Sequence, residues 1–172
     1  MGYNVIAYEV DKSKIEALWG SQNDDFAVYF LDKYEAEIED LADGFEIETI
    51  AFKICIEDII RGKISQTSEL NYIYGYVYEL LCQEFGNAVE PDDFLCYLDE
   101  ATDENHKAFI PIPANSDWPE FHSVEHTDLE KRKGSFKDHA RQYELDDYYF
   151  ESVDLIFNQA LLNKKDLVFF GY

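Results

Sequence analysis

Residues 70–85 read LNYIYGYVYELLCQEF, and this stretch decides the fold of the chain. Its apolar side chains recur at steps of three and four residues, which gathers them on one side of an α-helix. Three tyrosines cover much of the other side, and a helix that is apolar nearly all round is normally buried. The pattern therefore predicts a central buried helix. Gly75 in its interior costs about 1 kcal/mol relative to alanine, so we expect a neighbouring element to approach closely there.

Two further helices are predicted to share this core. Residues 47–61 carry apolar side chains, beginning with Ile50, around a narrow polar seam, and we expect them to form an antiparallel hairpin with residues 69–85. Residues 146–165 form the clearest amphipathic helix, with acids at its start and lysines at its end, as the helix dipole favours. The polar seam of the helix at residues 47–61 consists of Lys53, Glu57 and Arg61.

Both ends of the chain are predicted to be strands. Tyr3–Val10 and Leu167–Tyr172 are rich in β-branched and aromatic residues, and their apolar side chains on both faces indicate strands that are covered on both sides. Ala108–Pro113 is expected to be an edge strand, because each proline removes a donor from the ladder. Residues 87–107 show no sustained period and are expected to be a long acidic connection with a short strand or turn at Phe94–Leu98.

Two helices are predicted in the first part of the chain. Asp11 is a suitable N-cap for a short helix that Gly20 ends, and Asn23 or Asp24 can cap one longer helix that reaches Gly44. With the elements above, they predict an α+β fold in a single domain over residues 1–172. We expect a small mixed or antiparallel sheet that contains the N- and C-terminal strands, packed against several helices, those at 47–61, 69–85 and 146–165.

The formal net charge of the chain is -23 at pH 7. Such a field repels phosphate backbones and anionic lipids, which argues against binding to nucleic acid or to a membrane surface and favours a basic protein partner. The first ten residues lack the basic and apolar regions of a signal peptide, and no apolar run of about 18 residues occurs. The three cysteines form no C-x-x-C pair, which is typical of reduced thiols, so we expect a cytoplasmic protein.

Two acidic segments are the candidate partner-binding surfaces. In the first, acids stand one helical turn apart on the outer side of the helix that ends at Gly44, with Lys33 as the one cation among them. Like charges at this spacing weaken a helix slightly, so a one-signed face is an indication of use. The second segment lies in the acidic connection. The candidate residues are Asp32, Glu35, Glu39 and Asp43 in the first segment and Glu90, Asp92, Asp93, Asp99 and Glu100 in the second.

One motif could carry chemistry. His122-Ser-Val-Glu125-His126 matches H-x-x-E-H, the inverted zinc-peptidase pattern. On a helix the two imidazoles would lie one turn apart and could share a zinc ion, with Glu125 as the base that activates the metal-bound water. A third ligand would have to come from Glu144 or Glu151. A zinc-dependent hydrolase is therefore one alternative for the function.

The same residues also fit an extended segment. If residues 121–126 form a strand and Thr127 caps a following helix, with Glu130 at the capping-box position, the two histidines lie about 13 Å apart, too far for one metal ion. We favour this interpretation and predict no catalytic residue, no metal and no cofactor. The glycine-rich and nucleophile motifs of common enzyme classes are also missing from the sequence.

Four segments carry a family resemblance. They resemble a group of uncharacterised bacterial proteins that are distantly similar to the YfbM-like proteins, which are α+β single domains of unknown activity. The resemblance implies an α+β fold and a strand that enters a helix near Thr127, and it carries over no functional residue. The segments are Met1–Tyr8, Tyr74–Cys82, Val124–Glu130 and the closing helix with Asp166–Phe170.

These observations predict an acidic cytosolic binding protein without enzymatic activity. Its small size and charge resemble those of toxin-neutralising immunity proteins, so an immunity-type inhibitor of a basic partner is the more specific hypothesis. A third alternative is an inhibitor that mimics nucleic acid and occupies a DNA- or RNA-binding protein. The sequence leaves the oligomeric state open.

Overall fold

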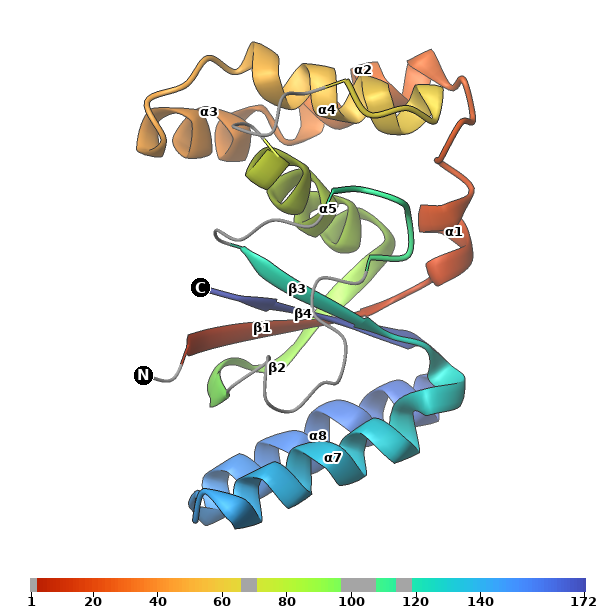
Figure 1. Cartoon of the computed structure of the whole chain (residues 1–172). Coiled ribbons are helices and arrows are strands. Elements are labelled where there is room, and N and C mark those ends of the chain that lie inside the picture. The colour runs from red at the N-terminus through yellow and green to blue at the C-terminus, as the bar shows by residue number, and fades with distance from the viewer. Residues whose placement is uncertain (1–2, 66–70, 97–107, 114–118) are drawn as a thin grey trace.

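The computed structural model describes residues 3–65, 71–96, 108–113 and 119–172, with the backbone alone for residues 3–4 and 90–96. The elements in chain order are β1 (Tyr3–Val10), α1 (Lys12–Glu16), α2 (Asp24–Lys33), α3 (Glu35–Gly44), α4 (Ile50–Arg61), α5 (Asn71–Phe85), β2 (Gly86–Cys96), β3 (Glu120–Val124), the 3₁₀ turn η2 (His126–Asp128), α7 (Leu129–Gln142), α8 (Asp147–Asn163) and β4 (Asp166–Gly171). They form layers: α2, α3 and α4 lie over α5, α5 lies over the sheet, and α7 with α8 covers the opposite face (Figure 1).

The sheet has the strand order β2-β1-β4-β3, and every neighbouring pair is antiparallel. The α+β fold and the sheet that joins both terminal strands are therefore confirmed. Alternate residues of β4 enter different cores: Val168 and Phe170 pack with α5, whereas Leu167 and Phe169 pack with α7 and α8. This double coverage explains why the terminal strands are apolar on both faces.

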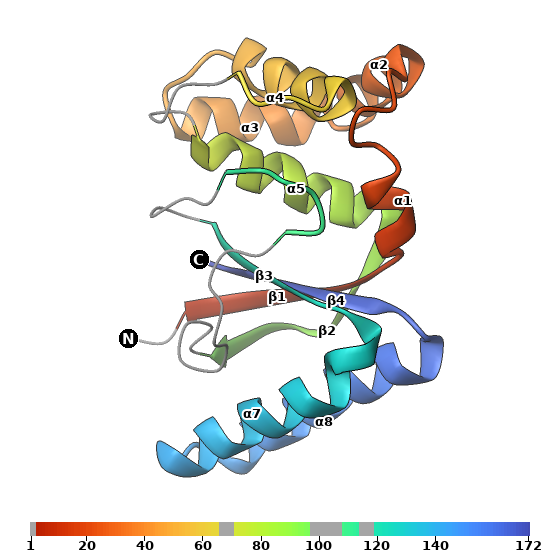
Figure 2. The same cartoon turned by 45° about the vertical axis from the view of Figure 1, so that its right-hand side comes forward.

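The central helix is confirmed as α5. Every residue from Ile73 to Cys82 is buried. The close approach expected at Gly75 is also present, because a Cβ atom there would lie 3.1 Å from the ring of Pro119, just before β3. The helix at 47–61 is confirmed as α4, but it packs on α5 in the outer layer rather than directly against the sheet (Figure 2).

The single helix predicted up to Gly44 is wrong in one respect. It breaks at Tyr34, whose backbone angles leave the helical region, so that α2 ends at Lys33 and α3 begins at Glu35. Asn23 caps α2 as predicted, since its side chain accepts a hydrogen bond from the Phe26 N–H. Tyr34 is 5% exposed, and burial of its ring against the core outweighs the loss of a continuous helix.

The acidic connection expected after α5 is also wrong over its first part. Residues 86–96 form the edge strand β2 instead, and the register with β1 shifts between Val5 and Ala7, opposite the part of β2 that contains Pro91. Prolines and register shifts are tolerated at an edge, which hides the strand from a pattern search. Residues 108–113 form bends and no strand, and residues 97–107 lie outside the described part of the chain.

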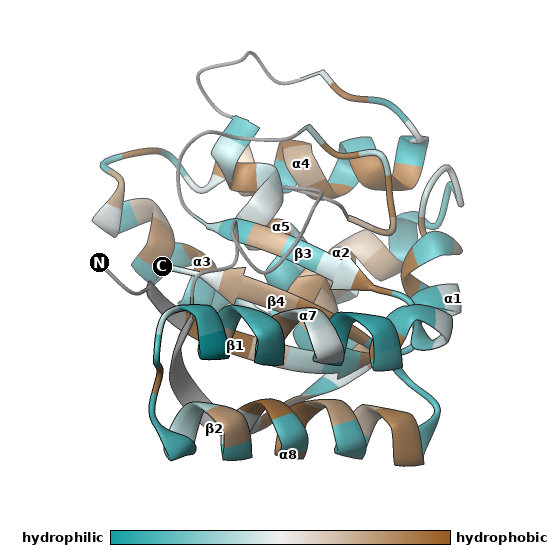
Figure 3. Ribbon diagram, turned by 60° about the horizontal axis from the view of Figure 1, so that its bottom comes forward, coloured by the Kyte–Doolittle hydropathy of each residue, from teal (hydrophilic) through white to brown (hydrophobic). Residues whose placement is uncertain are grey.

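The two helices under the sheet differ in how easily the sequence reveals them. α8 is amphipathic and begins at the predicted N-cap Asp146, whose side chain accepts a hydrogen bond from the Tyr149 N–H. α7 is hydrophilic along most of its length (Figure 3), so it shows no clear apolar stripe. It nevertheless packs through Leu129, Phe136 and Ala140, which are fully buried.

Candidate functional site

A groove runs between α4 on one side and α2 with α3 on the other. It consists of two hollows, of about 260 and about 540 Å³, which share Leu31, Glu35 and Lys53 and are therefore continuous. We call it the acidic groove. Its α2–α3 wall consists of Asp24, Ala27, Val28, Leu31, Asp32, Glu35, Ile38 and Glu39, and its α4 wall of Thr49, Ile50, Lys53, Glu57 and Arg61.

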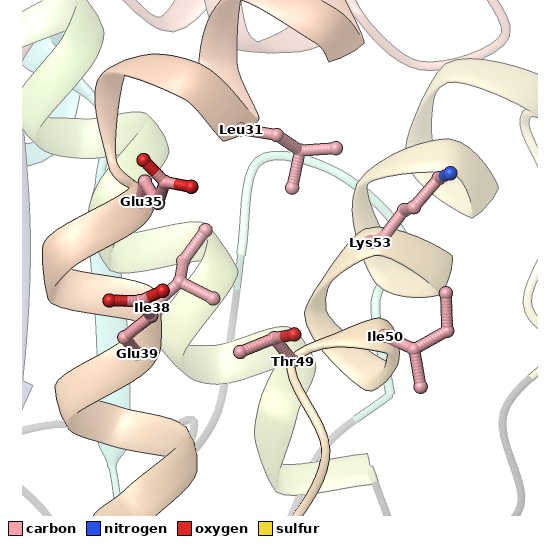
Figure 4. Close-up of a pocket in the computed structure, with 7 residues that line it drawn as sticks. All are labelled: Leu31, Glu35, Ile38, Glu39, Thr49, Ile50 and Lys53. Carbon is pink, nitrogen blue, oxygen red and sulfur yellow. The ribbon is translucent and has the colours of Figure 1, made fainter.

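The two walls of the acidic groove run in opposite directions. At one end, the Arg61 guanidinium in the last turn of α4 forms an ion pair of 2.6 Å with Asp24, where α2 begins. At the other end, Thr49 and Ile50, where α4 begins, lie across from Glu39 of α3 (Figure 4). The groove therefore lies between α4 and the antiparallel wall formed by α2 and α3, along its whole length.

A polar cluster fixes the end of α2 on α5. The Glu84 carboxylate of α5 accepts hydrogen bonds from the Tyr29 hydroxyl at 3.0 Å and the Tyr34 hydroxyl at 3.2 Å, and its distance to the Lys33 ammonium is 2.6 Å. Burial, with the nearby charge of Glu84, raises the pKa of Tyr34 to about 12. These contacts orient α2 so that the side bearing Asp32 faces the groove.

The acidic groove has a negative formal charge. Its lining contains five carboxylates and two cations, a net formal charge of -3. Lys53 lies 3.9 Å from Glu57 on its own helix, and Arg61 is paired with Asp24. Within the part of the chain that the structure describes, Asp32, Glu35 and Glu39 form no ion pair. They are exposed to solvent, so their charges are available to a cationic group.

Apolar side chains lie between these charges. Ala27 and Ile38 form a buried floor, and Leu31 is half-buried beside them. Val28 and Ile50 stand on the rim and are 69% and 47% exposed. Leu31, Glu35 and Ile38 point from the α2–α3 wall toward α4 (Figure 4). The groove therefore combines solvent-exposed acids with exposed apolar side chains, and such an apolar surface is a typical contact surface.

The structure brings together part of the predicted partner-binding set. Three of its acids, Asp32, Glu35 and Glu39, line the acidic groove. Asp43 is exposed in the last turn of α3 and lines neither hollow. The remaining five residues do not join them. Glu90, Asp92 and Asp93 lie on β2, which α5 separates from the groove helices (Figure 1), and their side chains are outside the described structure, as are residues Asp99 and Glu100.

The α4 wall is not assigned to a site by the sequence. Lys53 and Glu57 belong to the polar seam, whose spacing places them on one face of a helix, but nothing in the sequence states which element that face meets. The sequence places Ile50 in the buried stripe, and this is wrong because its side chain lies in the first turn of α4 at the groove rim. Val28 carries no polar pattern, so sequence reasoning misses it.

The H-x-x-E-H motif does not lie on a helix. His122 is buried in β3, and His126 begins η2. Glu125 binds Lys12 of α1, with 2.8 Å between its carboxylate and the ammonium. Asp128 rather than Thr127 precedes α7. The extended interpretation is confirmed, and among the described residues no group of three histidine, cysteine, aspartate or glutamate side chains is arranged to hold a metal ion.

Asp166 explains the sequence around the motif. One oxygen of its carboxylate accepts the backbone N–H of His126 at 2.8 Å, and the other accepts the N–H of Lys12 at 3.4 Å. The start of β4 thus holds the start of α1 and the start of η2 together. Two of the motif residues, Glu125 and His126, serve this junction.

A second cluster surrounds a buried acid. Glu79 of α5 is 8% exposed, and its two carboxylate oxygens accept hydrogen bonds from the Tyr8 and Tyr172 hydroxyls. Gln83 donates to the Tyr8 hydroxyl at 3.3 Å. Burial raises the pKa of Glu79 above its ordinary value. Because the cluster joins α5 to β1 and to the residue after β4, it acts as a structural tie.

The structure thus defines an α+β protein with an acidic groove between its outer helices. The chain belongs to the family of a domain of unknown function, DUF7691, whose model matches residues 1–172. No curated protein and no solved structure matches the chain. Membership supports the prediction of an uncharacterised family, whereas the likeness to the YfbM-like proteins and the bacterial source stay predictions. In the described residues no helix is long and apolar enough to cross a bilayer.

Proposed function

We propose that this protein is a non-enzymatic binding protein whose acidic groove receives a basic segment of a partner protein. The observation that carries the proposal is that exposed carboxylates, which form no ion pair among the described residues, share one groove with an apolar floor. Acids alone are consistent with a solvated surface. Apolar side chains between them favour a partner that buries surface as well as compensating charge.

Charge supports this proposal in two ways. The net charge of -23 attracts cationic proteins over long distances, which raises association rates at low salt. The local charge of Glu35 and Glu39 then favours lysine or arginine at the contact, where an ion pair at the rim contributes up to about 1 kcal/mol. Binding is therefore expected to weaken as salt rises, because the Debye length falls below about 10 Å above 0.1 M.

The more specific role we propose is an immunity-type inhibitor in the cytoplasm, which neutralises a basic toxin by covering its surface. A nucleic-acid mimic fits the groove less well, because the apolar floor formed by Ala27 and Ile38 has no counterpart in a phosphate backbone.

Affinity capture from the source organism tests the proposal. The wild-type protein is used as bait at about 50 mM and about 500 mM salt, beside a groove variant with Glu35→Gln and Glu39→Gln. We expect a basic protein that binds the wild type at low salt, elutes at high salt and is lost with the groove variant.

The matched control variant carries Glu37→Gln and Asp40→Gln. Both residues are exposed on α3 and lie outside the groove lining, and the double substitution removes the same charge. The control is expected to retain the partner. If both variants lose the partner equally, or if the amount of partner captured does not depend on the salt concentration, the groove is not the binding surface.

A further inference from the structure

The acidic groove is about as long as a short helix. Its α4 wall extends from Thr49 to Arg61, which is about 18 Å at 1.5 Å per residue. Along it, Ile50, Lys53, Glu57 and Arg61 follow one another at steps of three and four residues. On the facing wall, Val28, Leu31 and Glu35 do the same across the break at Tyr34. Two helical ridges thus border one furrow of about three turns.

We propose that the partner segment is an amphipathic α-helix that lies along this furrow with its apolar face on Leu31 and Ile38. The inference deepens the function proposed above and rests on it. The side-chain ridges of one helix pack into the grooves between the side chains of another. A third helix can therefore pack along its whole length between two neighbouring helices. Lysine or arginine at the edges of the incoming helix would meet Glu35 and Glu39.

Backbone hydrogen bonding is the physical reason for a helix rather than an extended chain. Both walls are α-helices, whose N–H and C=O groups are occupied within the helix. They offer an incoming backbone no ladder of partners, unlike the edge of a sheet. An extended segment would therefore bring unpaired peptide groups onto the apolar floor, at about 1–3 kcal/mol each. A helix satisfies these groups internally.

A polyproline segment is also a poorer match. Proline-rich ligands are normally held in grooves lined by aromatic side chains. The lining of the acidic groove, within residues 3–65, 71–96, 108–113 and 119–172, includes aliphatic side chains but no aromatic one. The lining instead matches leucine-like residues spaced at i, i+3, i+4 and i+7, which is the usual pattern of a helix bound in a groove.

Two designed peptides separate the helical inference from the function on which it rests. Each has about 15 residues, enough to span the groove, and both contain the same numbers of leucine and lysine. In one peptide leucine follows the helical period, and in the other leucine and lysine alternate as in a strand. Binding of fluorescently labelled peptides to the full chain is measured by anisotropy at about 150 mM salt. We expect the helical peptide to bind at least about tenfold more tightly.

Two matched pairs of variants locate the binding. Val28→Gln with Ile50→Gln removes exposed apolar groups from the groove rim without changing charge and is expected to weaken the helical peptide about tenfold. The control, Leu155→Gln with Leu162→Gln, removes apolar groups that are 49% and 82% exposed on α8 and is expected to leave binding unchanged.

The outcomes distinguish the two proposals. If the alternating peptide binds as tightly as the helical one, or if the rim variant binds the helical peptide like the wild type, the helical inference is overturned. If Glu35→Gln with Glu39→Gln weakens neither peptide more than Glu37→Gln with Asp40→Gln, the groove itself is not the binding surface and the proposed function fails. Absence of any peptide binding counts against both.

Discussion

The hydroxyl of Tyr172 donates a hydrogen bond to the buried carboxylate of Glu79. Tyr8 of β1 donates to the other oxygen of the same carboxylate at 3.1 Å. Glu79 lies on α5, so one acid links the central helix to β1 and to the residue that follows β4. β1 and β4 are the two inner strands of the sheet. The cost of burying this carboxylate makes the stability of the protein depend on pH in a defined direction.

The stability of the Glu79→Gln variant, measured relative to that of the wild type, is expected to increase as pH rises. Burial raises the pKa of Glu79 above the ordinary value of 4.5, although the Tyr172 and Tyr8 hydroxyls oppose the shift. A raised pKa contributes stability below about pH 4.5 that is lost as pH rises through the native value. Glutamine does not titrate, so its contribution is independent of pH. Free energies of unfolding from urea titrations at several pH values between about 4 and 8 measure the difference.

The control for this experiment is Glu37→Gln, which removes one charge from an exposed position of α3. It corrects for the general relief of repulsion in a chain of charge -23. A difference between Glu79→Gln and wild type that is flat with pH, or that falls as pH rises, contradicts the assignment of a buried carboxyl with a raised pKa.

Asp58 and Tyr74 are expected to be coupled energetically. Asp58 is 2% exposed, and one of its oxygens accepts hydrogen bonds from the Tyr74 hydroxyl at 2.6 Å and from Ser65. Asp58→Ala should destabilise the protein by about 2–4 kcal/mol, because the buried Tyr74 hydroxyl loses its acceptor and Ser65 loses its contact with α4. Tyr74→Phe should cost about 1 kcal/mol. The double variant should cost less than the sum, by about 1 kcal/mol.

Chemical denaturation of the four proteins in this cycle measures the coupling. Asp40→Ala, at an exposed position of α3, serves as a control for the loss of one acid and is expected to change stability by less than about 0.5 kcal/mol. Additivity of Asp58→Ala and Tyr74→Phe within about 0.3 kcal/mol would show that the hydrogen bond contributes nothing.

Alanine is expected to have opposite effects at Gly86 and Gly134. A Cβ atom at residue 86, where α5 turns into β2, would overlap the carbonyl oxygen of Glu9 and lie 2.9 Å from that of Cys82. Gly86→Ala should therefore destabilise the protein by about 3 kcal/mol. Gly134 is exposed in α7, and a Cβ atom there would meet no neighbouring atom within 4 Å. Gly134→Ala should stabilise the protein by up to about 1 kcal/mol. Thermal unfolding followed by circular dichroism compares them, and changes of the same sign would contradict this packing.

The sequence predicted those elements whose local pattern and tertiary surroundings agree. Tyr3–Val10, Leu167–Tyr172 and α5 are apolar enough to be buried wherever they lie, and they form the centre of the molecule. The break at Tyr34 depends on packing in the core and on the hydrogen bond from the Tyr34 hydroxyl to Glu84 of α5, which no local pattern encodes. β2 and α7 were predicted only in part: the sequence indicates a short strand or turn near Phe94 and a short helix after Thr127, whereas the structure shows an 11-residue edge strand and a 14-residue helix. An edge strand with a proline and a hydrophilic helix lack strong periodicity, so their full lengths could not be read from the sequence.

The candidate site was predictable on one wall only. The acids Asp32, Glu35 and Glu39 share a helical face, which their spacing reveals. These acids face Lys53 and an apolar floor because α4 packs against α2, and this tertiary contact cannot be read from the sequence. Glu90 resembles these acids in the sequence, yet it lies on a strand in another layer. Charge patterns identify faces, and only the fold decides which faces meet.

Asp154→Asn is expected to show the opposite pH dependence to Glu79→Gln. Asp154 of α8 lies 2.8 Å from the ammonium of Lys133 and 2.5 Å from that of Lys137, both on α7. These hydrogen bonds hold the pKa of Asp154 below its ordinary value of 3.8. A lowered pKa contributes stability above about pH 3.8 that is lost as pH falls through the native value. Because the Asp154 side chain is 41% exposed, solvent screens the pairs, and the loss at pH 7 should stay below about 1 kcal/mol.

Urea titrations near pH 7 and below pH 3.8 measure this loss, with Asp138→Asn as the control. Asp138 pairs with Arg141 inside α7, and both side chains are more than half exposed, so its removal should have almost no effect. The cost of Asp154→Asn should shrink at low pH and in about 1 M salt, where the Debye length is about 3 Å. A cost that grows on acidification would mean that Asp154 does not tie α7 to α8 through its charge. The pair of helices beneath the sheet would then depend on apolar packing, such as the contacts of Phe136 with Phe157 and Phe169.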